Sequence, residues 1–128
     1  MTVDRELIER RLQDLALRVA RLRTLRDLSP EAFSADWRNV WLAERGLQTA
    51  IQTVIDIGAH ILAALGDTDW DEYRTIPTRL AAHGVIPSEA VPLLERMIGL
   101  RNILVHPSIH WGSRSETSRA HRAALRGF

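Results

Sequence analysis

The chain contains no cysteine and no lysine among its 128 residues, and aromatic residues make up only 5% of it. Without cysteine it can form neither a disulfide framework nor a thiolate metal site, which agrees with a reducing cytoplasm as the expected location. No apolar run approaches the roughly 20 residues that a membrane-spanning helix requires, and the acidic residues among the first arginines are unlike a secretory signal. We therefore expect a cytoplasmic protein that does not enter a membrane.

The charged residues are almost balanced. All 17 basic residues are arginines, and against 16 acidic residues they leave a formal net charge of +1, which gives no general attraction to nucleic acid. Residues 112–128 differ, because they contain four arginines and one acidic residue. Such a basic tail can touch RNA phosphates, although tails of this kind are more often solvated or disordered. We expect one helical domain over residues 1–111 and a tail over residues 112–128 that is irregular or holds a short helix.

Apolar residues recur every three or four positions along most of the chain, which is the period of amphipathic helices. The first stripe predicts a helix over about residues 3–27. A serine, proline and glutamate at residues 29–31 form a helix start, and the stripe that follows reaches Gly66, which predicts one helix of about 50 Å if it is unbroken. Two further helices are expected, over residues 76–83 and 87–107. The pattern predicts an all-α protein of four or five helices in a bundle.

The long second helix carries more apolar surface, including Trp37 and Trp41, than one short neighbour can cover. Tryptophans in such a stripe belong more often to a core or an interface than to a platform for nucleobases. Several helices or a second chain must cover this surface, and we expect a homodimer. Gly58 within the helix marks either a close crossing of two helices or a weak point.

Arg101 occupies an unusual place in the last helix, whose predicted core stripe is Leu93, Met97, Leu100 and Leu104. The residues three and four positions before and after Arg101 are all apolar. A guanidinium within an apolar face is costly unless it is paired or lies in a polar cleft. Asn102 and His106 are four residues apart, so their side chains share a helix face and can meet.

His106 is predicted in the last helical turn before Pro107, where the helix C-terminus favours its charged form and nearby Arg101 opposes it. A histidine in this balance can act as a general acid or base near neutral pH. Arginine can hold a phosphate while histidine moves a proton to or from a ribose 2′-OH, so this set suits metal-independent phosphodiester transfer. The reaction needs two proton transfers but each chain offers one such histidine, and a symmetric dimer would supply the second. On spacing alone, a structural pair is the more common explanation.

The other histidines suggest less. His110 and His106 are four residues apart and could together bind a metal. However, Pro107 interrupts the helix between them and no carboxylate is near, so we expect neither a metal nor a cofactor. His60 and His83 are expected at the surface or at helix ends.

The stretch from Met97 to His106 resembles the signature of HepT-like proteins of the HEPN ribonuclease superfamily, which is an arginine, a polar residue, three more residues and a histidine. Residues 44–61 also resemble this family, as does the sequence from Tyr73 through Leu80 to Gly84. The resemblance covers about residues 3–108, in order and with similar spacing.

This resemblance implies an antiparallel up-down bundle that forms a homodimer, with both copies of the motif in one cleft. The implied activity is metal-independent cleavage of RNA by a growth-inhibiting toxin, in a HepT/MntA-type toxin–antitoxin system. Arg101 would bind and activate the phosphate, His106 would be the acid and base, and Asn102 would orient His106. The implied partner is an MNT-type nucleotidyltransferase antitoxin.

The chain departs from the family pattern after the motif. In the family the nucleotidyltransferase can transfer AMP to a tyrosine two residues after the histidine, but Ser108 stands at that position and the one tyrosine is Tyr73. Ser108 is then the hydroxyl available for modification there. Two alternatives to a ribonuclease stay open: a non-catalytic binding subunit of a nucleotidyltransferase, and a degenerate family member without activity.

Overall fold

The computed structural model describes residues 4–105 and 125–126. Over this part of the chain it contains α-helices and two short 3₁₀ helices but no strand, so the predicted all-α class is confirmed. The elements are α1 (Arg5–Arg26), α2 (Pro30–Ala35), α3 (Arg38–Ala64), η1 (Tyr73–Thr75), α4 (Ile76–Ala82), η2 (Ser88–Ala90) and α5 (Val91–Val105).

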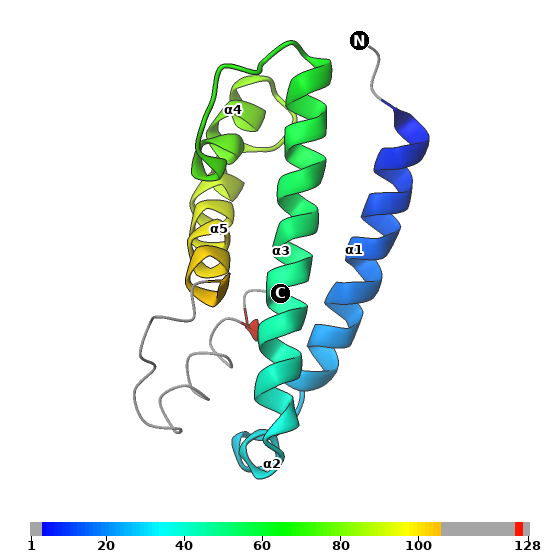
Figure 1. Cartoon of the computed structure of the whole chain (residues 1–128), viewed down its shortest axis with the longest axis vertical. Helices are drawn as coiled ribbons and strands as arrows, with labels where there is room; N and C mark the ends of the chain where they lie inside the picture. Colours follow the sequence, from blue (N-terminus) through cyan, green and yellow to red (C-terminus); the bar gives the residue numbers. More distant parts are fainter. Residues whose placement is uncertain (1–3, 106–124, 127–128) are drawn as a thin grey trace.

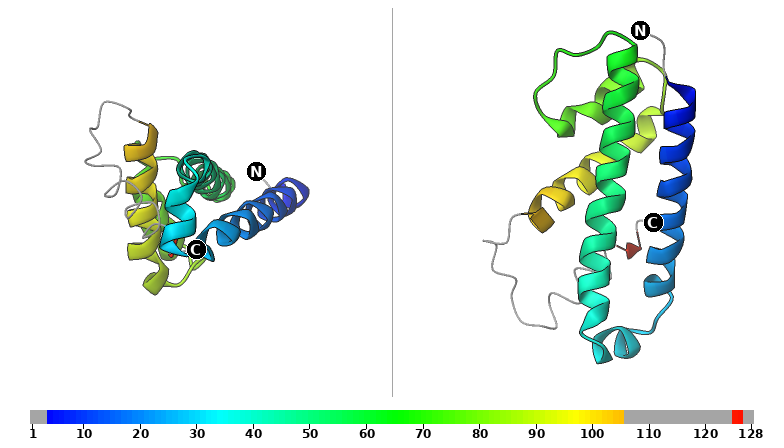
Figure 2. Two further views of the ribbon diagram at one scale, coloured as in Figure 1. Left: turned by 90° about the horizontal axis from the view of Figure 1, so that it is seen from below. Right: turned by 45° about the vertical axis from the view of Figure 1, so that its right-hand side comes forward.

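The helices pack around α3, which contacts α1, α2, α4 and α5. Figure 1 shows α1 and α3 running antiparallel, joined at the bottom by α2, and α5 returning downward on the other side of α3. The right-hand view of Figure 2 shows α5 inclined to α3. This is the predicted helical bundle. None of its described helices is both long and apolar enough to span a membrane.

The single helix predicted from residue 30 to Gly66 is wrong, because the chain breaks at Asp36. Its beginning and end are confirmed: the Ser29 hydroxyl caps α2 by accepting from the Ala32 N–H, and Gly66 has a φ of 77°. Asp36 adopts an extended backbone, and its carboxylate accepts hydrogen bonds from the backbone N–H and the guanidinium of Arg38. The side-chain hydrogen bond with Arg38 lowers the pKa of Asp36. An aspartate that satisfies the backbone in this way competes with helix continuation.

Two glycines of α3 let neighbouring helices approach closely. A Cβ at Gly58 would lie 2.7 Å from Cγ2 of Ile76 in α4, and a Cβ at Gly46 would lie 2.7 Å from Cδ2 of Leu22 in α1. Of the two explanations considered for Gly58, the close helix crossing is therefore confirmed.

The buried apolar side chains form two clusters along α3. The first contains Leu22, Phe33, Ala43, Leu47, Ala50 and Leu125. The second contains Ile51, Ile55, Leu62, Ile76, Leu80 and Ile98. The first joins α1, α2 and α3, and the second joins α3, α4 and α5.

Some residues of the predicted stripes lie outside these clusters. Trp37 and Trp41 are 57% and 65% exposed, because they lie on the outer face of this end of α3. Its inner face carries Val40 and Ala43, which contact or belong to the first cluster. In α5, Met97, Leu100 and Leu104 of the predicted stripe pack against the clusters. Leu93 of that stripe is 40% exposed, and Ile98, which the stripe did not include, is buried.

Candidate functional site

Packing of α5 fixes the direction in which Arg101 points. Ile98, one turn before Arg101, is buried in the second cluster. Leu100 and Leu104 pack against the first cluster, and Leu100 also contacts the second. Because these neighbours hold α5 at both clusters, the side chain of Arg101 is left partly buried beside the core.

The guanidinium of Arg101 has unused hydrogen-bond donors. Its Nη1 donates to Oδ1 of Asn102 at 3.2 Å. Its Nε is buried, and no residue in the described part of the chain accepts a hydrogen bond from it. A buried donor without an acceptor is costly, and a ligand with acceptor oxygens would remove that cost.

Other arginines contrast with Arg101. Arg79 forms an ion pair with Asp67 at 2.6 Å, and Arg38 pairs with Asp36 at 2.8 Å. Within residues 4–105 and 125–126 no carboxylate pairs with Arg101. A guanidinium held beside a core, with donors free and no carboxylate neutralising it, is suited to a phosphate.

Tyr73 is the neighbour of Arg101 that reasoning from the sequence did not assign to the site. The Arg101 Cζ lies 5.7 Å from the centre of the Tyr73 ring, which is a cation–π distance. Tyr73 belongs to η1 and is 43% exposed, and its ring lies 6.2 Å from that of Trp70. The resemblance included the Tyr73 segment, but nothing in the spacing linked it to Arg101.

The family model described as ribonuclease HepT-like matches residues 7–107. This chain belongs to the HepT-like family. The resemblance drawn from the sequence is therefore confirmed at the level of the family. The HepT-like match includes Arg101, Asn102 and His106, and it stops before Ser108. No curated protein matches the chain.

Of the predicted site residues, the structure brings Arg101 and Asn102 together through their hydrogen bond. His106 and Ser108 lie outside the described residues, as do His110 and the predicted boundary between residues 111 and 112. The expected contact of Asn102 with His106 therefore stays a prediction. Asn102 instead gains an observed role as an acceptor for Arg101.

The two described histidines differ. His83 lies at the C-terminal end of α4 and its Nε2 is 3.0 Å from a carboxylate oxygen of Asp67, so its expected place at a helix end is confirmed. His60 lies within α3, and its Nε2 is buried without a partner in the described part of the chain. His60 as a whole is partly buried in α3, so its expected surface or helix-end position is not confirmed. Among the residues that the structure places, no three His, Asp or Glu side chains gather as metal ligands.

Proposed function

We propose that this chain is a metal-independent endoribonuclease that acts in the cytoplasm as the toxin of a HepT/MntA-type toxin–antitoxin system. The observation that carries the proposal is Arg101, whose buried Nε has no acceptor and whose guanidinium has no carboxylate partner among the described residues. Membership of the HepT-like family supports RNA as the substrate.

In the proposed reaction Arg101 binds a phosphodiester and stabilises the negative charge that grows on its oxygens. His106 removes the proton of the ribose 2′-OH as that oxygen attacks phosphorus. The bond from phosphorus to the 2′-oxygen forms, and the bond to the 5′-oxygen of the next nucleotide breaks. That leaving oxygen takes a proton from a second acid, which a second copy of His106 can supply.

Asn102 orients the other two residues in this proposal. Its Oδ1 accepts from Nη1 of Arg101, and its spacing of four residues from His106 predicts that these two side chains share a helix face. A single side chain between the phosphate-binding group and the proton-transfer group keeps their separation constant.

The homodimer is part of the proposal because it supplies the second histidine. An exposed apolar patch, formed by Trp37, Trp41 and Leu42 at the start of α3, supports it. The two indole rings meet edge to face with centroids 5.0 Å apart, so the patch is preformed. We expect sedimentation at micromolar concentration to give a dimer, and a clean monomer would contradict this part of the proposal.

An MNT-type nucleotidyltransferase is the proposed antitoxin, and Ser108 is the proposed acceptor of a modification. Co-expression with such an enzyme should restore growth. Mass spectrometry should then find the added mass on the peptide that contains Ser108, and Ser108→Ala should remove it.

The proposal is tested by induced expression of the wild type beside Arg101→Ala and His106→Ala, with extraction of total RNA. Arg96→Ala is the matched control, because it removes an exposed arginine from the same helix. The wild type and the control should arrest growth and leave RNA fragments, and both motif variants should abolish the fragments.

Two outcomes would contradict the proposal. Fragments that persist with His106→Ala would mean that the active site lies elsewhere. No arrest and no fragments from any of the four proteins would favour a non-catalytic binding subunit or a degenerate family member. This is the second candidate function, because Ser108 replaces the tyrosine of the family.

A further inference from the structure

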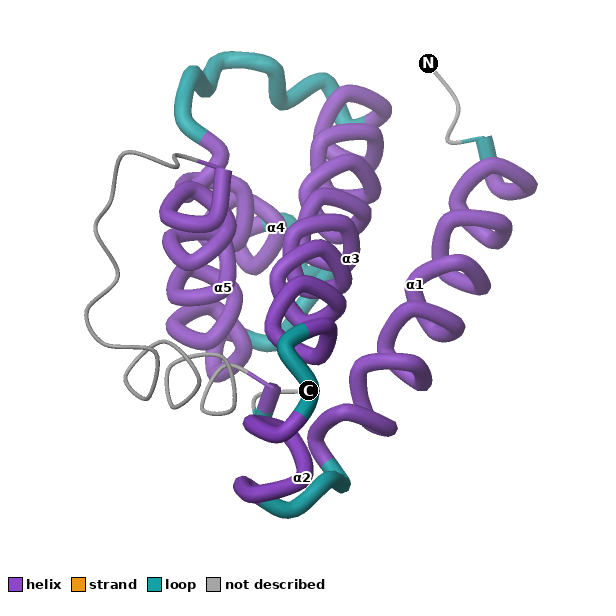
Figure 3. Tube along the Cα trace, turned by 60° about the horizontal axis from the view of Figure 1, so that its bottom comes forward, coloured by secondary structure: helices purple, strands orange, loops and turns teal. Residues whose placement is uncertain are grey.

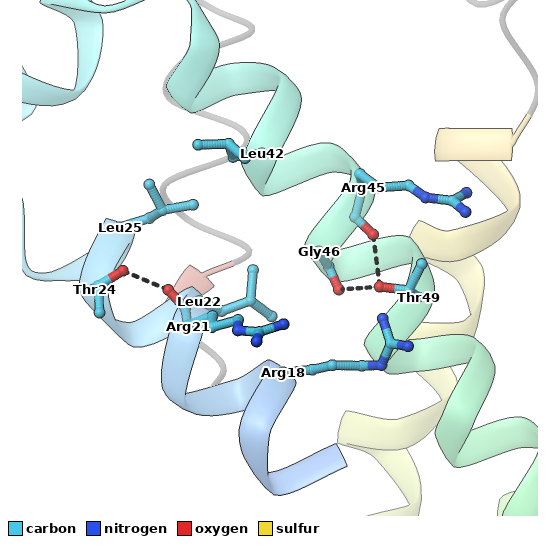
Figure 4. A pocket seen from close by; sticks show the side chains of 9 residues that line it. All are labelled: Arg18, Arg21, Leu22, Thr24, Leu25, Leu42, Arg45, Gly46 and Thr49. Atoms are coloured by element: carbon cyan, nitrogen blue, oxygen red, sulfur yellow. Dashed lines mark hydrogen bonds between the residues drawn. The ribbon is translucent and has the colours of Figure 1, made fainter. Parts of the chain in front are cut away.

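A cavity of about 500 Å³ lies between α1 and α3, and neither Arg101 nor Asn102 lines it. Figure 4 shows the side chains that line the cavity, of which one group comes from α1 and the other from α3. The lining residues are Arg18, Arg21, Leu22, Thr24, Leu25, Leu42, Arg45, Gly46 and Thr49. Three of the nine are arginines, and none carries a carboxylate.

The positive charge of this cavity is only partly neutralised. Arg18 pairs with Asp14 at 3.0 Å. Arg21 and Arg45 form no ion pair with a residue in the described part of the chain, although acidic residues are nearly as numerous as arginines in the whole sequence. Two arginines from opposite walls, both free of carboxylates, create a site that attracts an anion.

The hydroxyls in the cavity leave acceptor capacity. Thr24 donates to the carbonyl of Arg21 at 2.6 Å, and Thr49 donates to that of Arg45 at 2.9 Å. Each hydroxyl proton is therefore used, while the oxygen lone pairs remain available to the N–H or O–H groups of a ligand.

The rest of the lining is apolar. Leu22, Leu25 and Leu42 supply it, so an inorganic anion alone would leave much of the cavity unused. A nucleotide unit combines a phosphate for the arginines with a planar base for the leucines or for stacking on a guanidinium. A volume of about 500 Å³ also falls within the usual range for small-ligand sites.

We propose that this cavity binds one nucleoside monophosphate unit, with Arg21 and Arg45 on its phosphate. The unit comes either from single-stranded RNA or from a free nucleotide, and its assignment to RNA rests on the proposed ribonuclease function.

The test measures binding of two probes to the full chain: AMP and a 2′-O-methyl RNA hexamer, which lacks the attacking hydroxyl. The cavity variant is Arg21→Gln with Arg45→Gln. The matched control is Arg10→Gln with Arg11→Gln, because these exposed arginines of α1 lie outside the cavity and the charge change is the same. Circular dichroism verifies that both variants fold.

We expect the cavity variant to bind the hexamer at least tenfold more weakly than the control does, since each charge-assisted contact to phosphate contributes about one such factor. The slope of log affinity against log salt should fall by roughly 0.7, because the contact to one phosphate of a single strand is lost. Loss of hexamer binding with no AMP binding by the wild type identifies RNA as the source. A parallel loss of AMP binding identifies a free nucleotide.

The inference is overturned if the wild type binds neither probe, or if the cavity variant and the control lose affinity equally. Its failure is distinguishable from that of the proposed function, because cleavage of an unmodified hexamer is measured separately. A wild type that binds through Arg21 and Arg45 but cuts nothing would refute the ribonuclease and leave the cavity site standing.

Discussion

The two sides of α3 differ in how well they are packed. On the side of α4 and α5, the second cluster is closed by Gly58, which lets Ile76 and Leu80 approach α3 closely. On the side of α1, Leu22 is the one residue of that helix that is buried, and Leu12 and Leu17 are about half exposed. Figure 3 shows the N-terminal turns of α1 standing apart from α3.

This difference separates two tasks. The α4–α5 side fixes the direction of Arg101 through buried neighbours, as the proposed phosphate-binding role requires. The α1 side leaves apolar side chains and the arginine-lined cavity accessible, which suits binding. If this division is right, substitutions on the α4–α5 side should cost stability, and those on the α1 side should change binding.

The largest expected difference in stability is between two truncations of apolar side chains. Ile55 is 1% exposed in the second cluster, whereas Leu12 of α1 is 49% exposed. Ile55→Ala should lower the free energy of unfolding by about 3 kcal/mol through lost burial and a new cavity. Leu12→Ala should cost less than about 1 kcal/mol. Urea denaturation measures both free energies of unfolding, and equal losses would contradict the difference in packing between the two sides of α3.

The two glycines of α3 give a more closely matched pair. Gly58→Ala would press its methyl group against Cγ2 of Ile76 at 2.7 Å, with a Leu80 methyl at 3.2 Å, so the neighbours have little room to yield. Overpacking should outweigh the gain in helix propensity and leave a net loss of about 1–2 kcal/mol.

Gly46→Ala meets only the far end of Leu22, whose helix is loosely packed. A rotation of that leucine should bring the net change within about 0.5 kcal/mol. Thermal unfolding of both variants tests this, and a larger loss at Gly46 would reverse our interpretation of the two sides.

Two aspartates extend the comparison to polar contacts. Asp67 has a side chain that is 14% exposed, and it binds both Arg79 and His83. Asp67→Asn should cost about 1 kcal/mol, because two partners lose their carboxylate. Asp14 pairs only with Arg18, and both side chains are more than a third exposed, so Asp14→Asn should cost less than about 0.5 kcal/mol. Equal costs in urea denaturation would contradict the comparison.

Local signals in the sequence predicted much of the fold. Ser29 and Gly66 marked the beginning and end of a helical region, and the recurrence of apolar residues every three or four positions predicted the all-α class. The break at Asp36 was missed because an aspartate that accepts a hydrogen bond from a nearby backbone N–H competes with a helix without disturbing the apolar pattern.

The site was only partly predictable, for a different physical reason. Arg101 and Asn102 were both named from the sequence, but their hydrogen bond was not predicted, because adjacent side chains on a helix do not normally face each other. Tyr73 approaches Arg101 only because η1 packs against α5. Arg21 and Arg45 likewise line one cavity from two different helices, and in sequence each resembles an ordinary solvated arginine. Contacts between distant segments require the tertiary structure.

Tyr73 offers the finest test of the claim that the α4–α5 side positions Arg101. A ring 5.7 Å from the guanidinium carbon contributes about 0.5–1 kcal/mol at a partly exposed site. If Tyr73 is a positioning residue, Tyr73→Leu should lower kcat for RNA cleavage about threefold with KM almost unchanged, and Tyr73→Phe should restore kcat because the ring rather than the hydroxyl faces the cation. Leu17→Ala is the control from α1, with no change expected in kcat. A fall in kcat that Phe does not restore would assign the effect to the hydroxyl, and an unchanged kcat in Tyr73→Leu would mean that packing of α5 alone holds Arg101.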